Sequence, residues 1–206
     1  MPEMTRRKAL GLLAVAPFAA NAFTWTDAEA AVAFEKAGRA VKRERATGES
    51  FEPAFFTAAE FALVGVLADM VIPRDARSGG ALDAGVPEFM DFMMTDKPDR
   101  QVAMRGGLAW IDAASRRMHG ADFVAATPAQ RASLLDQIAF PNDADEDMGP
   151  GTAFFNSFRD ITASGFFTSK MGIEDLQYMG NRVTPVWNGC PDACYEHLGV
   201  TKPANG

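Results

Sequence analysis

The chain has 206 residues, of which 48% are hydrophobic and 16 are phenylalanine, and its formal net charge is −7. This length and apolar content suffice for one domain with a substantial core. The acidic charge argues against a nucleic-acid ligand, whose phosphates require a basic surface, and against binding to anionic lipid.

The first 22 residues have the composition of an export signal. Arg6 and Arg7 precede a short apolar run at residues 9–20, and residues 20–22, Ala-Asn-Ala, fit a small-x-small cleavage site. Paired arginines before such a run are typical of the twin-arginine route, which exports proteins that have already folded. The apolar run is too short to span a bilayer. The alternative is an uncleaved helix or a chance pair of arginines.

Residues 23–54 are expected to form an N-terminal helix and a linker. Thr26 and Glu29 have the spacing of a capping box at the start of an alanine-rich helix that extends to about Arg45. Residues 46–54 contain glycine and proline and break the helical pattern.

Helix signals continue through the middle of the chain. Thr57 with Glu60, and Thr127 with Gln130, form two further capping boxes. The expected helices are residues 58–71, residues 87–94, a long helix from a cap at Asp99 to about His119 and Gly120, one that begins after Thr127 and carries Ile138, and residues 152–167. Between them we expect a glycine-rich loop at residues 74–85 and an acidic loop at residues 141–151.

Gly106 and Gly107 fall in the middle of the long helix, where each glycine costs about 1 kcal/mol of helix stability. We expect them to permit the close approach of another helix.

No segment shows the period-2 alternation of a strand, so the predicted class is all-α. We expect a single irregular helical domain over residues 55–206, ending in an extended, loop-rich C-terminal tail after Thr168. No later segment is expected to span a membrane.

The tail contains the only two cysteines, Cys190 and Cys194. In an exported protein such a close pair is typical of a disulfide. Free thiols are one alternative. A metal site that includes His197 is another, although the C-x3-C-x2-H spacing differs from that of common zinc sites. A disulfide here would close a very small loop and would mainly fix the shape of the tail.

Motifs for cofactor binding and catalysis are missing from the sequence. It contains neither the dinucleotide fingerprint G-x-G-x-x-G between a strand and a helix nor the nucleophile elbow G-x-S-x-G. The acidic loop lacks the twelve-residue calcium pattern. We therefore expect no catalytic, cofactor-binding or metal-binding residue in this chain. A folded-export signal on such a chain suggests that the signal also serves a partner.

Aromatic residues in and beside the tail are candidates for contact with that partner. We expect Phe166, Phe167, Tyr178 and Trp187 to form a partner interface, because aromatic anchors concentrate at the centres of interfaces. The alternative is that the tail packs over its own helices.

Several stretches, found in order, resemble the gluconate 2-dehydrogenase subunit 3 family, the small subunit of membrane-associated flavin dehydrogenases. They are residues 55–61 (FFTAAEF), 68–75 (ADMVIPRD), 78–91 (SGGALDAGVPEFMD), 165–169 (GFFTS), Gly172, 176–181 (LQYMGN) and 189–190 (GC). The paired-arginine leader is also usual in that family. Three positions depart from the family pattern, which often has Pro at Gly79, Tyr at Phe166 and Gly at Gln177.

The resemblance implies a non-catalytic accessory subunit. In that family the FAD lies in a large catalytic subunit of the glucose-methanol-choline class, which oxidises a sugar, sugar acid or polyol, and a glycoside is a further possible substrate. The large subunit lacks its own signal and is exported to the periplasm with the small one, and electrons pass to a cytochrome c or another membrane-linked acceptor. The alternatives are a stand-alone periplasmic enzyme, a small-ligand-binding protein, or a purely structural exported domain.

Overall fold

The computed structural model describes residues 32–33, 35–39, 48, 51–140, 146–180 and 189–201. The signal with Arg6 and Arg7, the first capping box and Trp187 lie outside the described residues. By its contacts the chain divides into two units, Met1–Leu176 and Gln177–Gly206. We call the described part of the first the body and the described part of the second the tail.

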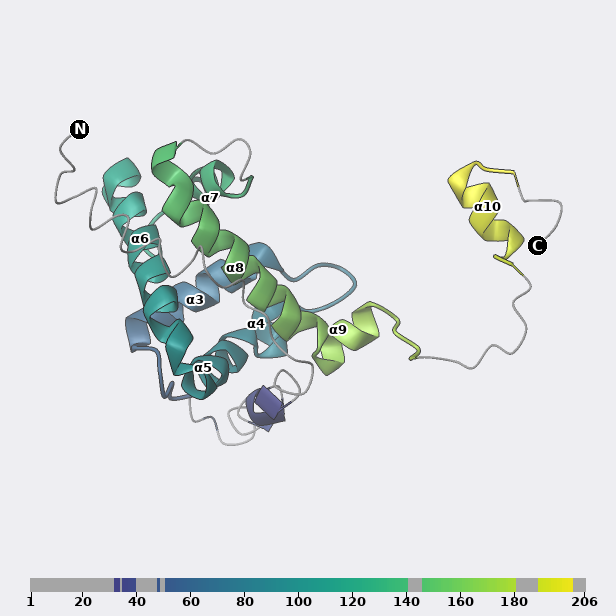
Figure 1. Cartoon of the computed structure of the whole chain (residues 1–206), viewed down its shortest axis with the longest axis horizontal. Coiled ribbons are helices and arrows are strands. Elements are labelled where there is room, and N and C mark those ends of the chain that lie inside the picture. The colour runs from purple at the N-terminus through teal and green to yellow at the C-terminus, as the bar shows by residue number, and fades with distance from the viewer. Residues whose placement is uncertain are drawn as a thin grey trace. The chain divides into compact units, whose positions relative to one another are not determined.

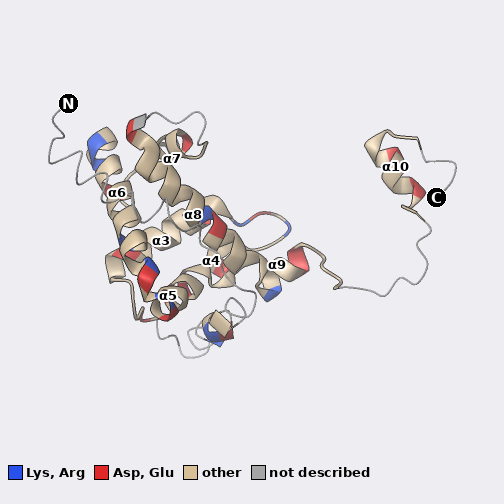
Figure 2. Ribbon diagram, in the orientation of Figure 1, with Lys and Arg blue, Asp and Glu red and all other residues tan. Residues whose placement is uncertain are grey.

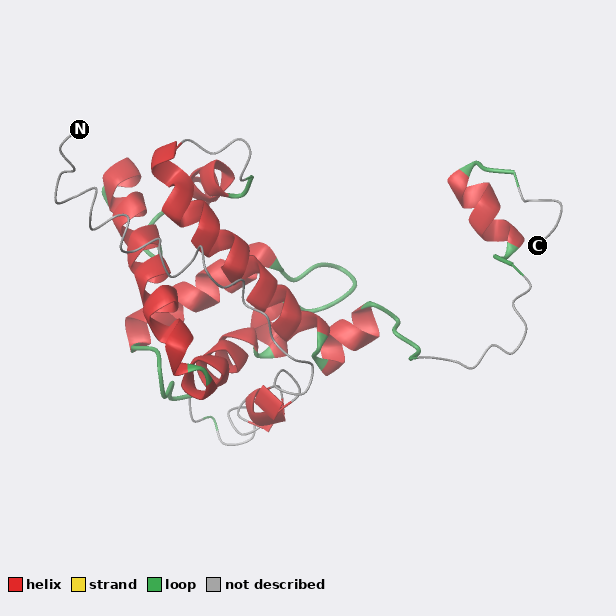
Figure 3. Ribbon diagram, viewed as in Figure 1, coloured by secondary structure: helices red, strands yellow, loops and turns green. Residues whose placement is uncertain are grey.

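Helices are the only regular structure among the residues that the model describes, which confirms the all-α prediction (Figure 3). The helices of the body are α3 (Ala58–Val71), α4 (Ala81–Ala84), α5 (Val86–Asp96), α6 (Gln101–His119), α7 (Pro128–Ile138), α8 (Gly149–Phe167) and α9 (Lys170–Asp175) (Figure 1). Two 3-10 turns, Pro98–Arg100 and Glu146–Met148, precede α6 and α8, and α10 (Asp192–Leu198) lies in the tail. Residues 32–33 and 35–39 are also helical, as expected for the N-terminal helix.

The capping boxes begin α3 and α7 as the sequence predicts. The hydroxyl of Thr57 accepts a hydrogen bond from the Glu60 amide at 3.2 Å, and the Glu60 carboxylate accepts one from the Thr57 amide at 2.8 Å. Thr127 and Gln130 form the same reciprocal pair at α7. Gly120 ends α6 with a φ of 75°, in the left-handed region that glycine favours.

The expectation that residues 74–85 form a loop is wrong in part, because these residues contain the short helix α4. The Asp83 carboxylate accepts a hydrogen bond from the Gly80 amide at 2.9 Å and so caps this single turn. Gly85 then takes a φ of 79°, which ends α4 and starts α5 at once. The expectation that Asp99 caps the long helix is also wrong. The N-cap of α6 is Arg100, whose side chain makes no capping hydrogen bond.

The expectation of irregular chain after Thr168 is also wrong in part. Ser169 is 2% exposed, and its hydroxyl accepts a hydrogen bond from the Gly172 amide at 2.8 Å, which begins α9. The tail forms α10.

Helix α8 is the centre of the body and contacts α3, α4, α5, α6, α7 and α9 (Figure 1). Its buried side is rich in phenylalanine, with Phe154, Phe155, Phe158 and Phe166 each at most 7% exposed. Glycines allow its neighbours to come close. A Cβ at Gly151 would lie 2.2 Å from the Trp110 ring of α6, and a Cβ at Gly165 would lie 2.8 Å from the Phe89 ring of α5.

Candidate partner-binding surface

The predicted interface aromatics lie in different environments. Phe166 belongs to the core at 2% exposure, so it offers no exposed anchor, and we leave it out of the candidate surface. Its ring stacks edge-on against Phe167, with centroids 5.1 Å apart. Phe167 is 40% exposed and Tyr178, in the tail, is 62% exposed. The two neighbouring phenylalanines differ in exposure because both belong to α8 and successive residues of a helix point in different directions, so that only Phe166 faces the core.

Two further exposed apolar residues lie on α9, where the sequence predicted no helix. Ile173 is 41% exposed and Leu176, which caps the helix, is 56% exposed. Residues three positions apart in a helix lie on one face. The sequence signal that could have predicted α9 is Ser169, a residue type favoured at N-cap positions, whose hydroxyl accepts a hydrogen bond from the Gly172 amide at the start of the helix.

Short side chains and close backbone packing fix α9 against the end of α8. A Cβ at Gly172 would lie 2.1 Å from the carbonyl oxygen of Phe166, so only glycine fits there. Met171 packs on the loop before α4, because a Cβ at Gly79 would lie 2.8 Å from its sulfur.

An ion pair joins the same loop to α9. The guanidinium of Arg77 donates two hydrogen bonds to the Asp175 carboxylate, at 2.6 Å from Nε and 2.9 Å from a terminal nitrogen. The Asp175 side chain is only 9% exposed, whereas that of Arg77 is 69% exposed. This paired arrangement raises the pKa of the Arg77 guanidinium. The two residues are 98 positions apart, so this is a tertiary contact between loop and helix.

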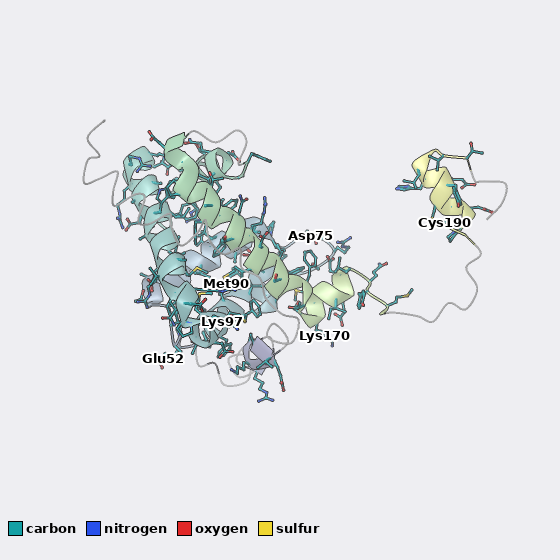
Figure 4. The ribbon with its side chains drawn as sticks, viewed as in Figure 1. Glu52, Asp75, Met90, Lys97, Lys170 and Cys190 are labelled. Atoms are coloured by element: carbon teal, nitrogen blue, oxygen red, sulfur yellow. The ribbon has the colours of Figure 1, made fainter. Side chains whose placement is uncertain are left out.

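The loop that presents Arg77 is shaped by Asp75. Its carboxylate accepts hydrogen bonds from the amides of Ser78 and Arg77, both at 2.8 Å. These bonds, first from Ser78 and then from Arg77, lower the pKa of the Asp75 carboxyl. Figure 4 labels Asp75 in this loop and Lys170 at the start of α9.

A second set of contacts holds the segment before α3. The carboxylate of Asp91, on α5 and fully buried, accepts hydrogen bonds from the amides of Ala54, Phe55 and Phe56 at 2.8, 2.9 and 3.0 Å. Arg105 of α6 donates to the Phe55 carbonyl at 2.7 Å and lies 4.6 Å from the centre of the Phe55 ring. We call these contacts the Asp91 clasp.

A shallow groove of about 230 Å³ runs between α3 and α6. Its apolar lining includes Leu63 and Leu108. Its ionic groups are already paired, with Arg105 3.4 Å from Glu60 and Arg116 3.9 Å from Asp112. Because each charged side chain of these two pairs has a partner of opposite charge, the groove presents no unpaired charge to a ligand.

In the tail, α10 contains no buried residue, and Leu198 is 69% exposed. Both Cys190 and Cys194 are exposed and unbonded in this structure, so the disulfide stays a prediction. Within the described ranges, no group of three or more histidine, cysteine, aspartate or glutamate side chains is arranged to hold a metal ion. Figure 2 shows the charged residues, which are distributed over the helices of the body and on α10.

One comparison with known proteins finds a match. A family model described as Gluconate 2-dehydrogenase subunit 3 matches residues 58–186, which include all of α3 to α9. No curated protein and no solved structure matches the chain. Within the part of the chain that the structure describes, no helix combines the length and the apolar character needed to cross a membrane.

Proposed function

This chain belongs to the gluconate 2-dehydrogenase subunit 3 family, and on that premise we propose that it is the non-catalytic small subunit of a periplasmic, FAD-dependent dehydrogenase complex. The partner is a large catalytic subunit of the glucose-methanol-choline class that binds FAD and oxidises a sugar, polyol or glycoside. The observation that carries this proposal is the family match over residues 58–186, because the family is described as a subunit of a dehydrogenase.

The leader gives this subunit its second role, which is to escort the flavoprotein during export. The twin-arginine route accepts folded cargo, so a large subunit without a signal can cross the membrane while bound to this chain. In this arrangement the flavin and the chemistry belong to the partner, and electrons leave it for a cytochrome c or another membrane-linked acceptor. The exposed apolar groups of α9 and of the tail support a role in binding another protein.

The test is purification of the tagged full-length chain from cells of its native organism, followed by identification of any flavoprotein that co-purifies with it. We expect both polypeptides in one complex, with the flavin absorbance and the sugar-dependent reduction of a dye found only in fractions that contain the large subunit. Purified alone, this chain should be colourless and inactive. Flavin or dehydrogenase activity in the isolated chain would overturn the proposal and favour a stand-alone enzyme.

A further inference from the structure

We propose that the outward face of α9 and the adjoining end of α8 are the part of the body that docks on the catalytic subunit, and that the ion pair of Arg77 and Asp175 holds this face in position. We call Phe167, Ile173 and Leu176 the α9 surface. The proposal rests on the proposed function, because it takes the flavoprotein as the occupant.

The α9 surface places three large apolar side chains within ten residues of chain, at exposures of 40%, 41% and 56%. Single exposed apolar residues are normal on a protein surface, whereas a contiguous apolar patch is typical of an interaction surface. Ile173 and Leu176, three positions apart, lie on one face of α9. Tyr178, predicted to be at the interface, follows Leu176 by two positions in the chain and is 62% exposed. The candidate surface therefore leads along the chain directly into the predicted contact residues of the tail.

Tertiary contacts hold the α9 surface, although α9 has only six residues. A helix this short is unstable in water without tertiary contacts. Here it is held by the Ser169 cap, by the contact of Gly172 with the Phe166 carbonyl, and by the loop through Met171 and Asp175. A surface that is fixed before binding loses little conformational entropy when a partner covers it. These contacts therefore hold the apolar face of α9 in one position.

The charges around the α9 surface are paired with one another. Lys170 lies 3.7 Å from Glu174, and Arg77 is bonded to Asp175. A partner can cover this region without burying a charge that has no counter-ion. This pattern fits an apolar protein surface. It does not fit a polyanion or a phosphate head group, which would need free cationic groups.

The net charge of residues 23–176 disfavours a second copy of the chain as the occupant. The chain has a net charge of −7; residues 1–22 contribute +2 and residues 177–206 are neutral, with two basic and two acidic residues, so residues 23–176 have a net charge of −9. Two such bodies repel each other, and each repels anionic lipid. A different protein is therefore favoured as the occupant, and under the proposed function that protein is the catalytic subunit.

The first test removes the apolar face and leaves the helix in place. In the co-expressed, full-length complex, Ile173→Ser together with Leu176→Ser should weaken binding of the flavoprotein by about tenfold or more, as at other interface centres. The matched control is Val102→Ser together with Val124→Ser, which removes two exposed aliphatic residues outside the α9 surface (73% and 39% exposed) and should leave binding unchanged. Equal binding by both double variants would overturn the proposal.

The second test addresses the ion pair as a positioning device. Arg77→Asp should weaken binding of the flavoprotein, and adding Asp175→Arg should restore it by re-forming the pair with its charges exchanged. Thermal unfolding of each variant separates this role from a loss of fold: the proposal requires binding to fall while the body's melting temperature stays near that of the wild type. Failure of the exchange to restore binding, or a loss of binding that only follows unfolding, would count against it.

These outcomes also separate the two proposals. If the wild-type chain retains no flavoprotein, the proposed function fails. If the wild type retains it and the Ile173 and Leu176 variant does so equally well, only the docking surface is wrong. A wild-type homodimer that the double variant abolishes would assign the surface to a second copy and overturn the inference.

Discussion

Gly107 of α6 lies directly against the ring of Phe154 in α8, where a Cβ on the glycine would come within 1.9 Å of the phenylalanine Cδ2. Phe154 is fully buried, so its ring has no free space to move into. The contact explains why a glycine stands in the middle of a long helix. It confirms the expectation of a close helix approach for Gly107, whereas the same expectation is wrong for Gly106, beside which there is open space.

Gly107→Ala should therefore destabilise the body by about 1–3 kcal/mol through overpacking, although alanine favours helices. The neighbouring Gly106 has no atom within 4 Å of the position that a Cβ would take. Gly106→Ala should accordingly stabilise the body by up to about 1 kcal/mol. Urea unfolding of both variants checks the prediction, and equal free energies of unfolding would refute the packing argument.

The Asp91 clasp should contribute strongly to stability. Asp91→Ala leaves three backbone amides without their acceptor, and we expect the free energy of unfolding to fall by about 3 kcal/mol. Hydrogen exchange at residues 54–56 should accelerate more than exchange in α8. The matched control is Asp160→Ala, which removes an exposed carboxylate and should change stability by less than about 0.5 kcal/mol. Similar effects of the two variants would show that the clasp is not stabilising.

Gln177 occupies the position just past the C-terminus of α9, with a φ of 53°, where glycine is the favoured residue. Gln177→Gly should remove a strain of about 1 kcal/mol and slow exchange of the Leu176 amide, which donates to the Gly172 carbonyl at 2.9 Å. Gln177→Val should do the opposite, because a β-branched residue is poorly accommodated in this region. Unchanged exchange in both variants would mean that the left-handed conformation imposes no strain.

The escort role predicts a shared export defect. With Arg6→Lys and Arg7→Lys together, the flavoprotein should stay in the cytoplasm along with this chain, because the pair of arginines is the address that the route reads. Cell fractionation followed by flavin and immunoblot analysis measures this outcome. Lys8→Arg, which keeps the arginine pair, is the control and should export normally. Normal export of both subunits from the double variant would remove the escort role.

The cysteine pair is predicted to be oxidised in the exported protein. Thiol titration of the periplasmic form should detect no free thiol, whereas after reduction both cysteines should react at once because both are exposed. Cys190→Ser with Cys194→Ser should leave the unfolding transition of the body unchanged, since the two residues belong to the separate tail unit. Two reactive thiols in the native exported chain would show that the disulfide does not form.

The sequence predicted the helices whose ends are marked by local capping residues. The hydroxyls of Thr57 and Thr127 and the left-handed Gly120 act within one turn of chain, so their residue types alone indicate where α3 and α7 begin and α6 ends. The helices that it missed are short. With four, six and seven residues, α4, α9 and α10 are too short to establish a helical period in the sequence, and α4 and α9 are stabilised by contacts with other elements.

The candidate surface was harder to predict because its contacts are distant in the chain. Arg77 and Asp175 are 98 residues apart, and Asp91 binds amides 35 to 37 residues before it. Neither pairing has a spacing that a sequence motif could reveal. The sequence predicted correctly that this helix ends at Phe167, but the burial of Phe166 and the exposure of Phe167 depend on which elements pack against the last turn of α8, and those contacts are tertiary.

The central position of α8 also determines when this protein can fold during its synthesis. This helix packs against six others, yet it begins only at Gly149. As the ribosome extends the chain, α3 to α7 emerge before the element that covers their apolar faces exists. We therefore expect the core of the nascent body to stay incomplete until translation has passed Phe167.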